Sequence, residues 1–124
     1  HKTIKLKIMN NLQKIMRIAQ EGGFASDEET LDPCTYRLVH MFRTMLNSKI
    51  QAGVPFNVAV LELSNTINIR QLTINNLLSE YSPEELSAID IDLYSDWIIL
   101  QAGSKIKEAD PVSMFTANLL RKMF

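Results

Sequence analysis

The sequence predicts an all-α fold, a compact bundle of five to six helices with short capped turns. Three pairs indicate helix starts, because each places a side-chain acceptor at an N-cap and proline at the first helical position: Asp32-Pro33, Ser82-Pro83 and Asp110-Pro111. Glycines indicate helix ends, where a left-handed residue is favoured: Gly22-Gly23, Gly53 and Gly103. Apolar residues recur at helical spacing between these signals. We therefore expect a single helical domain over residues 1–124.

The first predicted helix runs from Ile4 to about Gln20 and ends at Gly22-Gly23. It is amphipathic, with one apolar face made of Ile4, Ile8, Leu12, Ile15 and Ala19. An acidic connector follows from Phe24 to Leu31. Within it, Ser26-Asp27-Glu28-Glu29 has the spacing of a capping box and is consistent with a single helical turn.

The next predicted helix spans Pro33 to about Ala52, and the segment after it is ambiguous. Its apolar residues alternate like a strand from Phe56 to Val60, yet they also fit a helix that continues to Leu63. We predict a helix, because no second candidate strand exists that could satisfy the backbone of a lone strand. A break is expected at residues 66–68, followed by a fourth helix that ends near Tyr81.

The fifth predicted helix opens with a capping box at residues 82–85 and continues to Gly103, with a kink or restart at residues 90–92 as an alternative. The sixth begins at Asp110-Pro111 and carries Phe115, Leu119 and Met123 at helical spacing. The predicted core comprises Ile8, Leu12, Ile15, Leu38, Phe42, Leu46, Phe56, Leu63, Leu77, Leu93, Trp97 and Phe115.

Composition narrows the class of protein. The chain has 124 residues, of which 46% are hydrophobic and 22% charged, as expected of one ordinary globular domain. A formal net charge of −1 argues against a protein that coats nucleic acid generally. The single cysteine excludes an intrachain disulfide, and no apolar run reaches bilayer length, so we expect a cytoplasmic location. His1 stands in place of methionine and is interpreted as a cloning remnant or the result of trimming.

The sequence offers no local catalytic set. Cys34 lies near a helix N-terminus, but neighbouring acids oppose a thiolate and His40, six residues on, falls on another helical face. His40 also lacks a second metal ligand three or four residues away. Asp90, Asp92 and Asp96 lack the glycine turn and closing glutamate of a calcium loop. We therefore expect no enzyme activity, no cofactor, no metal site and no small-molecule substrate.

The stretch from Gly53 to Ser79 carries only two charged residues, Glu62 and Arg70. Its apolar residues exceed what one helical face can hold, which fits either a central core helix or a surface covered by a second chain. The leading hypothesis is a non-enzymatic protein–protein interaction or regulatory subunit that binds a protein partner or itself, with a homodimer favoured. The candidate surface consists of Val54, Val58, Leu61, Ile69 and Leu72.

The alternative hypothesis is a DNA-binding transcriptional regulator, acting alone or with a partner subunit. It would use a helix-turn-helix-like unit at about 56–80. Its candidate phosphate contacts are Lys5, Lys7, Lys14, Arg17 and Arg70, and its candidate base contacts are Gln71, Thr73 and Asn75. The run from Gly53-Val54 to Val58-Ala59 and Leu61 resembles the small helical subunit of the bacterial flagellar master regulator over less than a third of the chain. No residue role is transferred from that resemblance.

Overall fold

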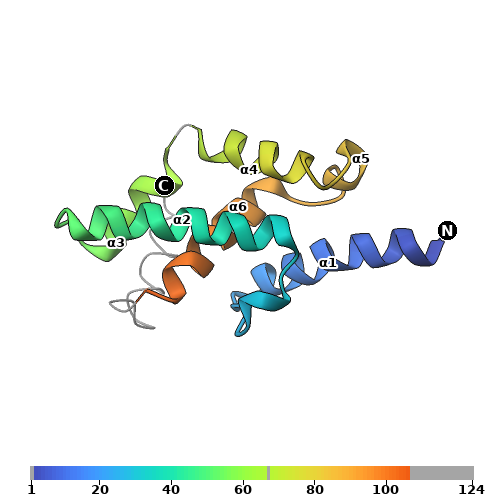
Figure 1. The fold of residues 1–124 in the computed structure, drawn as a ribbon, viewed down its shortest axis with the longest axis horizontal. Helices are drawn as coiled ribbons and strands as arrows, with labels where there is room; N and C mark the ends of the chain where they lie inside the picture. The colour runs from blue at the N-terminus through green and yellow to red at the C-terminus, as the bar shows by residue number, and fades with distance from the viewer. Residues whose placement is uncertain (1, 67, 107–124) are drawn as a thin grey trace.

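Two helices, α2 and α6, pack along each other through the centre of the protein (Figure 1). The computed structural model describes residues 2–66 and 68–106, and of residues 2–11 it describes the backbone alone. In chain order its elements are α1 (Lys2–Glu21), the 3-10 turn η1 (Glu28–Thr30), α2 (Pro33–Gln51), α3 (Phe56–Ser64), α4 (Ile69–Leu78), α5 (Pro83–Leu86) and α6 (Ile91–Ser104). The described ranges contain no strand, so the all-α prediction is confirmed there.

The core is built around the α2–α6 pair. Helices α3 and α4 each pack against both α2 and α6, while α1 packs on α6. Fully buried side chains come from all four bundle helices around the centre, among them Phe42, Leu46, Leu63, Leu77 and Ile98. The C-terminal part of α1 adds Leu12 and Ile15 to this core, and its N-terminal part extends past the other helices (Figure 1).

Two of the three predicted proline-marked helix starts, at Asp32 and Ser82, are confirmed by their caps. Asp32 accepts a hydrogen bond from the Thr35 N–H at the start of α2. Ser82 and Glu85 form the predicted capping box at the start of α5. Asp90 caps α6, so the predicted fifth helix is divided into the single turn α5 and the long helix α6. The restart at residues 90–92 is therefore the alternative that the structure adopts.

The segment that begins at Phe56 is helical, as predicted, and a break separates α3 from α4. The single turn in the connector also forms, as η1, but its cap is Asp27, whose carboxylate accepts from the Glu29 N–H. The predicted sixth helix and Phe115 lie outside the described residues, as does Ile67. Nothing is described of the Ile8 side chain.

The glycines at helix ends divide into two groups. Gly22 and Gly53 adopt positive φ, at 74° and 95°, as the left-handed C-cap prediction requires. The prediction for Gly103 is wrong, because this residue is buried inside the last turn of α6. The Arg43 side chain donates to the carbonyl oxygens of Gln101 and Ala102 there. A side-chain donor thus satisfies helix-end carbonyls without a left-handed glycine.

Most of the predicted core is confirmed. Leu12, Ile15, Leu38, Phe42, Leu46, Leu63, Leu77 and Trp97 are buried. Phe56 and Leu93 are only half-buried and pack at the edge of the core. Both lie in the first turn of a helix.

The first prediction concerns the N-cap of α2. Asp32→Ala should lower the free energy of unfolding by about 2 kcal/mol, because it removes a cap and also the acceptor of the Thr35 and Tyr81 hydroxyls. Urea denaturation followed by circular dichroism measures this change. Asp27→Ala, which removes the cap of the exposed turn η1, is the matched control and should cost about 1 kcal/mol or less. Equal losses in the two variants would contradict the prediction.

Candidate functional site

A surface groove lies between α1 and the connector, defined here as residues 22–32. Its volume is about 410 Å³, and we call it the connector groove. Its lining combines apolar residues with polar and charged ones: Lys14, Ile15, Ile18, Phe24, Ala25, Ser26, Asp27, Thr30, Leu31 and Asp32. Phe24 is 42% exposed, although it is a large apolar side chain. The groove therefore presents apolar surface to solvent beside a lysine.

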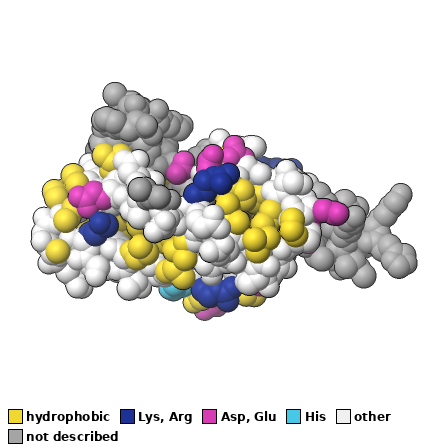
Figure 2. All heavy atoms as spheres, turned by 90° about the horizontal axis from the view of Figure 1, so that it is seen from above, with side chains coloured by type: hydrophobic (Ala, Val, Ile, Leu, Met, Phe, Trp, Pro, Cys, Tyr) yellow, Lys and Arg dark blue, Asp and Glu magenta, His cyan; other side chains and the backbone are white. Residues whose placement is uncertain are grey.

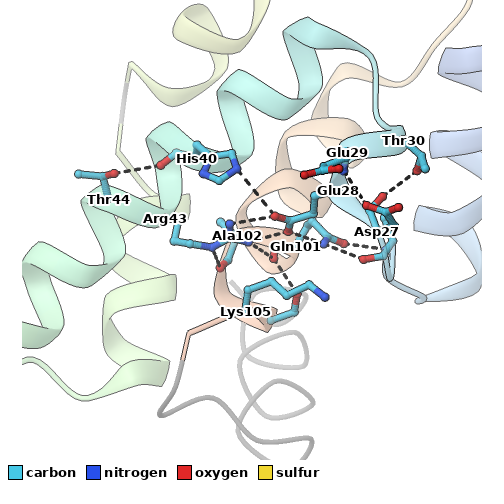
Figure 3. A network of polar contacts seen from close by, with 12 residues as sticks. Asp27, Glu28, Glu29, Thr30, His40, Arg43, Thr44, Gln101, Ala102 and Lys105 are labelled. Carbon is cyan, nitrogen blue, oxygen red and sulfur yellow. Dashed lines mark hydrogen bonds and ion pairs between the residues drawn. The ribbon is translucent and has the colours of Figure 1, made fainter.

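One wall of this groove is held by a polar network that we call the connector network, formed by Glu28, Arg43 and Gln101 (Figure 3). Arg43 on α2 donates to both carboxylate oxygens of Glu28, at 2.9 and 2.6 Å, in a bidentate ion pair. Gln101 on α6 donates to the second of those oxygens at 2.7 Å. The pair is well shielded, because the side chains of Glu28 and Arg43 are only 11% and 15% exposed.

The backbone of the connector is bound just as closely. The Gln101 amide donates to the Ala25 carbonyl at 3.0 Å and accepts from the Ala25 N–H at 2.8 Å. The Trp97 indole donates to the Gly23 carbonyl at 3.0 Å. Lys105 donates to the Ser26 carbonyl at 3.1 Å. A loop that could otherwise move is thus fixed to α6 on both sides of Phe24.

A second polar cluster lies at the start of α2, which we call the α2 cluster: Asp32, Thr35, Tyr81 and Tyr94. The Thr35 hydroxyl is 2.6 Å from an Asp32 carboxylate oxygen and 2.7 Å from the Tyr94 hydroxyl. Tyr81 donates to the other Asp32 oxygen at 2.9 Å. Burial, with the Asp32 charge, raises the pKa of both tyrosines, so they stay protonated donors at neutral pH. The cluster joins α2 to α6 and to the turn after α4.

Cys34 is buried near the start of α2. Its thiol donates to the Asn76 carbonyl at 3.1 Å. Burial, helped by the charges of Asp32 and Glu80, raises the pKa of Cys34 to about 11. The thiolate needed for nucleophilic chemistry is therefore scarce at neutral pH.

His40 points outward on α2 instead of toward Cys34. Its side chain is 46% exposed, its ring contacts the Tyr36 ring at a centroid distance of 4.3 Å, and its Nε2 lies 4.0 Å from a Glu28 oxygen. This contact with a carboxylate is at the surface, and Glu28 already binds Arg43. Neither His40 nor Glu28 lines the connector groove. The described residues hold no group of three or more His, Cys, Asp or Glu that could bind a metal ion.

The structure distributes the five candidate self-association residues over different environments. Val58 is exposed and Leu61 is partly exposed on α3. Val54 and Leu72 are half-buried against the core. Ile69 is buried at the start of α4, so it is not part of a surface. Figure 2, which looks down on α4, shows that the hydrophobic side chains of this face form several patches with charged side chains between them.

The candidate DNA contacts also lie in different places and environments. Lys14 and Arg17 are exposed on α1, and the side chains of Lys5 and Lys7 are outside the described set. Arg70 donates to Asp92 at 2.9 Å, and Gln71 donates to Asn75 at 2.8 Å, all at the surface. Thr73 is buried and donates to the Ile69 carbonyl, so it cannot reach a base edge. Helices α3 and α4 pack mainly on α2 and α6, whereas the two helices of a helix-turn-helix pack together.

Sequence reasoning found Asp32 of the α2 cluster only as a helix cap and Tyr81 only as the end of a helix. It did not single out Thr35 or Tyr94, and it missed the connector groove. Nothing in the sequence around Arg43 or Gln101 indicated a buried polar contact. An arginine on the polar face of a helix and a glutamine near a helix end are usually solvated. The acidic connector itself was recognised. Its partners lie 15 and 73 residues away in the chain, and no local pattern encodes such distances.

In comparisons with known proteins, no family model, no curated protein and no solved structure matches the chain. Among the described residues, no helix has the length and apolar character needed to cross a bilayer.

The second prediction tests the connector network. Burial alone would raise the pKa of Glu28, but hydrogen bonds from Arg43 and Gln101 and the Arg43 charge outweigh it and lower that pKa. This carboxylate therefore stabilises the fold above the usual glutamate pKa of about 4.3, and the stabilisation is lost as the pH falls through the lowered value. At pH 7, Glu28→Gln should cost about 3 kcal/mol, since it leaves Arg43 without its charge partner.

The difference in unfolding free energy between Glu28→Gln and the unaltered chain should shrink as the pH falls below about 4. Glu29→Gln, at the neighbouring exposed position, is the matched control and should change stability little at any pH. Urea denaturation at a series of pH values measures both. A loss from Glu28→Gln that does not vary with pH would contradict the electrostatic account.

The third prediction concerns Glu80, whose carboxylate accepts the Cys34 N–H at 3.3 Å. Burial and the nearby Asp32 charge raise the pKa of Glu80. A carboxyl group with a raised pKa binds protons more readily in the folded state, so its contribution to stability improves as the pH falls from 7 toward the usual glutamate range. Glu80→Gln keeps an acceptor for Cys34 and should therefore be as stable as the unaltered chain, or more stable, at pH 7. Thermal melts at pH 7 and 5 test this, and a large loss at pH 7 would contradict it.

Proposed function

We propose that this chain is a non-enzymatic interaction or regulatory subunit that associates with a second copy of itself through the outer face of α3. The observation that carries the proposal is that α3 is apolar on two sides. Ala59, Val60 and Leu63 are buried against the bundle. Val58, on the outer side, is 42% exposed, and Leu61 lies one turn further along beside it.

The charge distribution around this face supports contact with a second copy. No charged residue occurs between Ile50 and Leu61. At the edge, Lys49 and Glu62 are already paired with each other at 3.0 Å. Two copies can therefore bring their α3 helices together about a two-fold axis without opposing like charges. Burying apolar side chains there would supply the favourable free energy.

The alternative, DNA binding, gains less support from the geometry. Thr73, one of its candidate base contacts, is buried in the core. Arg70, a candidate phosphate contact, forms an ion pair with Asp92. The exposed cations Lys14 and Arg17 lie on α1, which packs on α6. Few phosphate contacts predict weak and strongly salt-dependent affinity.

The fourth prediction tests the α3 face. Val58→Glu should shift the chain toward monomer, because it places a charge in the apolar contact. Its helix should survive, since Val58 is the third residue of α3 and an acidic side chain is favourable near a helix N-terminus. Light scattering coupled to gel filtration over a range of concentrations measures the mass. We expect the dissociation constant to rise at least about tenfold, corresponding to a loss of about 1.4 kcal/mol.

The matched control is Tyr36→Glu, near the start of α2, where an apolar side chain of similar exposure, 38%, receives the same charge. It should leave the mass unchanged. A strictly monomeric unaltered chain at high concentration would overturn the proposal. If labelled duplex DNA instead binds at low salt and dissociates near physiological salt, and Lys14→Ala/Arg17→Ala weakens it, the alternative function is favoured.

A further inference from the structure

The N-terminal half of helix α1 extends past the other helices (Figure 1). Further along the same helix, Leu12 and Ile15 are only 1% and 3% exposed, so their side of α1 faces the bundle. Residues seven positions apart in a helix lie on nearly the same side. Lys5 and Ile8 stand seven positions before Leu12 and Ile15, and they therefore share that face. We call residues 2–8 of α1 the α1 arm.

The face that the α1 arm carries beyond the bundle combines apolar and basic residues. Ile4 and Ile8 are four positions apart, the spacing of neighbours on one helical face, and Lys5 lies on the same side. The chain has no acid before Glu21. Two arms that packed together would bring like charges into contact, which opposes association. The arm is therefore suited to a surface that offers an apolar side chain flanked by acids.

Such a surface lies toward the same end of the molecule as the arm (Figure 1). The sequence between Arg70 and Lys105 carries six acids and no Lys or Arg. Leu78, at the end of α4, is 45% exposed. Glu84 on α5 is exposed, and among the described residues its carboxylate has neither an ion pair nor a hydrogen bond. We call Leu78, Glu84 and Glu85 the acidic end.

The arrangement favours a second copy of the chain as the partner of the arm. Leu12 and Ile15 hold α1 on the bundle, and the arm extends beyond the α5 helix of its own chain (Figure 1). Because the arm and the acidic end lie toward one end of the longest axis, a two-fold axis beyond that end can place each arm on the other copy. Contacts exchanged in this way close with two copies.

We propose that the α1 arm of one copy docks on the acidic end of a second copy, and that the two copies exchange their arms reciprocally. Ile4 and Ile8 pack against Leu78, and Lys5 pairs with Glu84. Helix α3 lies toward the opposite end of the molecule (Figure 1). The arm contact is therefore separate from the α3 contact and does not rest on it.

Salt separates the two contacts experimentally. The Debye length falls from about 10 Å at 0.1 M salt to about 3 Å at 1 M salt, so the charged part of the arm contact weakens. Burial of apolar side chains on α3 does not depend on that screening. The unaltered chain should therefore form species larger than a dimer at low salt and dimers at 1 M salt.

The fifth prediction tests the arm contact in a chain that carries Val58→Glu, which removes the α3 contact. Light scattering coupled to gel filtration at low salt should show that this chain forms dimers at high concentration. Adding Lys5→Glu should raise the dissociation constant of these dimers at least about tenfold, because a carboxylate then faces Glu84. Adding Glu84→Lys in place of Lys5→Glu should have the same effect.

An equimolar mixture of the Lys5→Glu and Glu84→Lys chains should regain the dimer, since each arm then meets an acidic end of opposite charge. Lys7→Glu is the matched control, because it makes the same change of charge on the same arm. Lys7 stands seven positions before the exposed Lys14 and so lies on the other side of α1. This control should keep the dimer. Circular dichroism checks that the helices persist in every variant.

Four results would overturn the proposal. A Val58→Glu chain that stays monomeric at high concentration and low salt would show that the arm makes no contact between copies. Equal losses from Lys5→Glu and Lys7→Glu would show an effect of net charge alone. Recovery when both changes are in one chain, without recovery in the mixture, would place the contact within the chain. Monomers that bind anionic lipid vesicles, and lose this binding in Lys5→Glu, would show that the arm contacts membranes instead.

Failure of the α3 contact gives a different result. At 1 M salt the unaltered chain and the Val58→Glu chain would then have the same mass, whatever the arm variants do at low salt.

Discussion

The guanidinium of Arg43 connects α2, η1 and α6, which are far apart along the chain. It leaves the middle of α2, donates to two carbonyls in the last turn of α6 and forms a bidentate pair with Glu28 in η1. Helix α6 can end at this point because the arginine satisfies carbonyls that a helix end leaves unpaired. The connector can lie against α6 because Gln101 adds hydrogen bonds to its backbone. Without this set of contacts, the wall of the connector groove would be an ordinary acidic loop.

The α2 cluster joins the start of α2 to the start of α6, opposite the end of α6 that Arg43 contacts. Asp32 caps α2, and it also accepts hydrogen bonds from Thr35 and Tyr81, while Thr35 reaches Tyr94 on α6. Buried polar groups specify a structure when all of them find partners, because any misplaced packing leaves one unsatisfied. The α2–α6 pair is thus held by apolar packing and by polar contacts near both ends of α6. This arrangement fixes the position of α2 along α6, which packing of similar aliphatic side chains alone would define less sharply.

The α3 face and the connector groove differ in the physical reason for their exposure. On α3, the inner face contacts α2 and α6, and the outer residues are exposed among the residues that the structure describes. The α3 face is exposed because the helix has more apolar residues than its inner face can bury. Phe24 in the connector groove is exposed because hydrogen bonds fix the backbone on either side of it. Only the α3 face leaves a signal in composition, namely the charge-poor stretch that includes α3.

The sequence by itself determined the fold class, the helix starts and most of the core. These are local properties: a cap contacts an N–H two or three residues away, and helical periodicity spans about four residues. It left the division at Asp90 as an alternative to one continuous helix, and the structure adopts that alternative with Asp90 as the cap of α6. Tertiary structure alone decided that Gly103 lies within a helix, that Thr73 and Ile69 are buried, and that Glu28 meets Arg43 and Gln101. These outcomes depend on which helices lie side by side, and contacts between residues far apart in the chain carry no periodic signal along it.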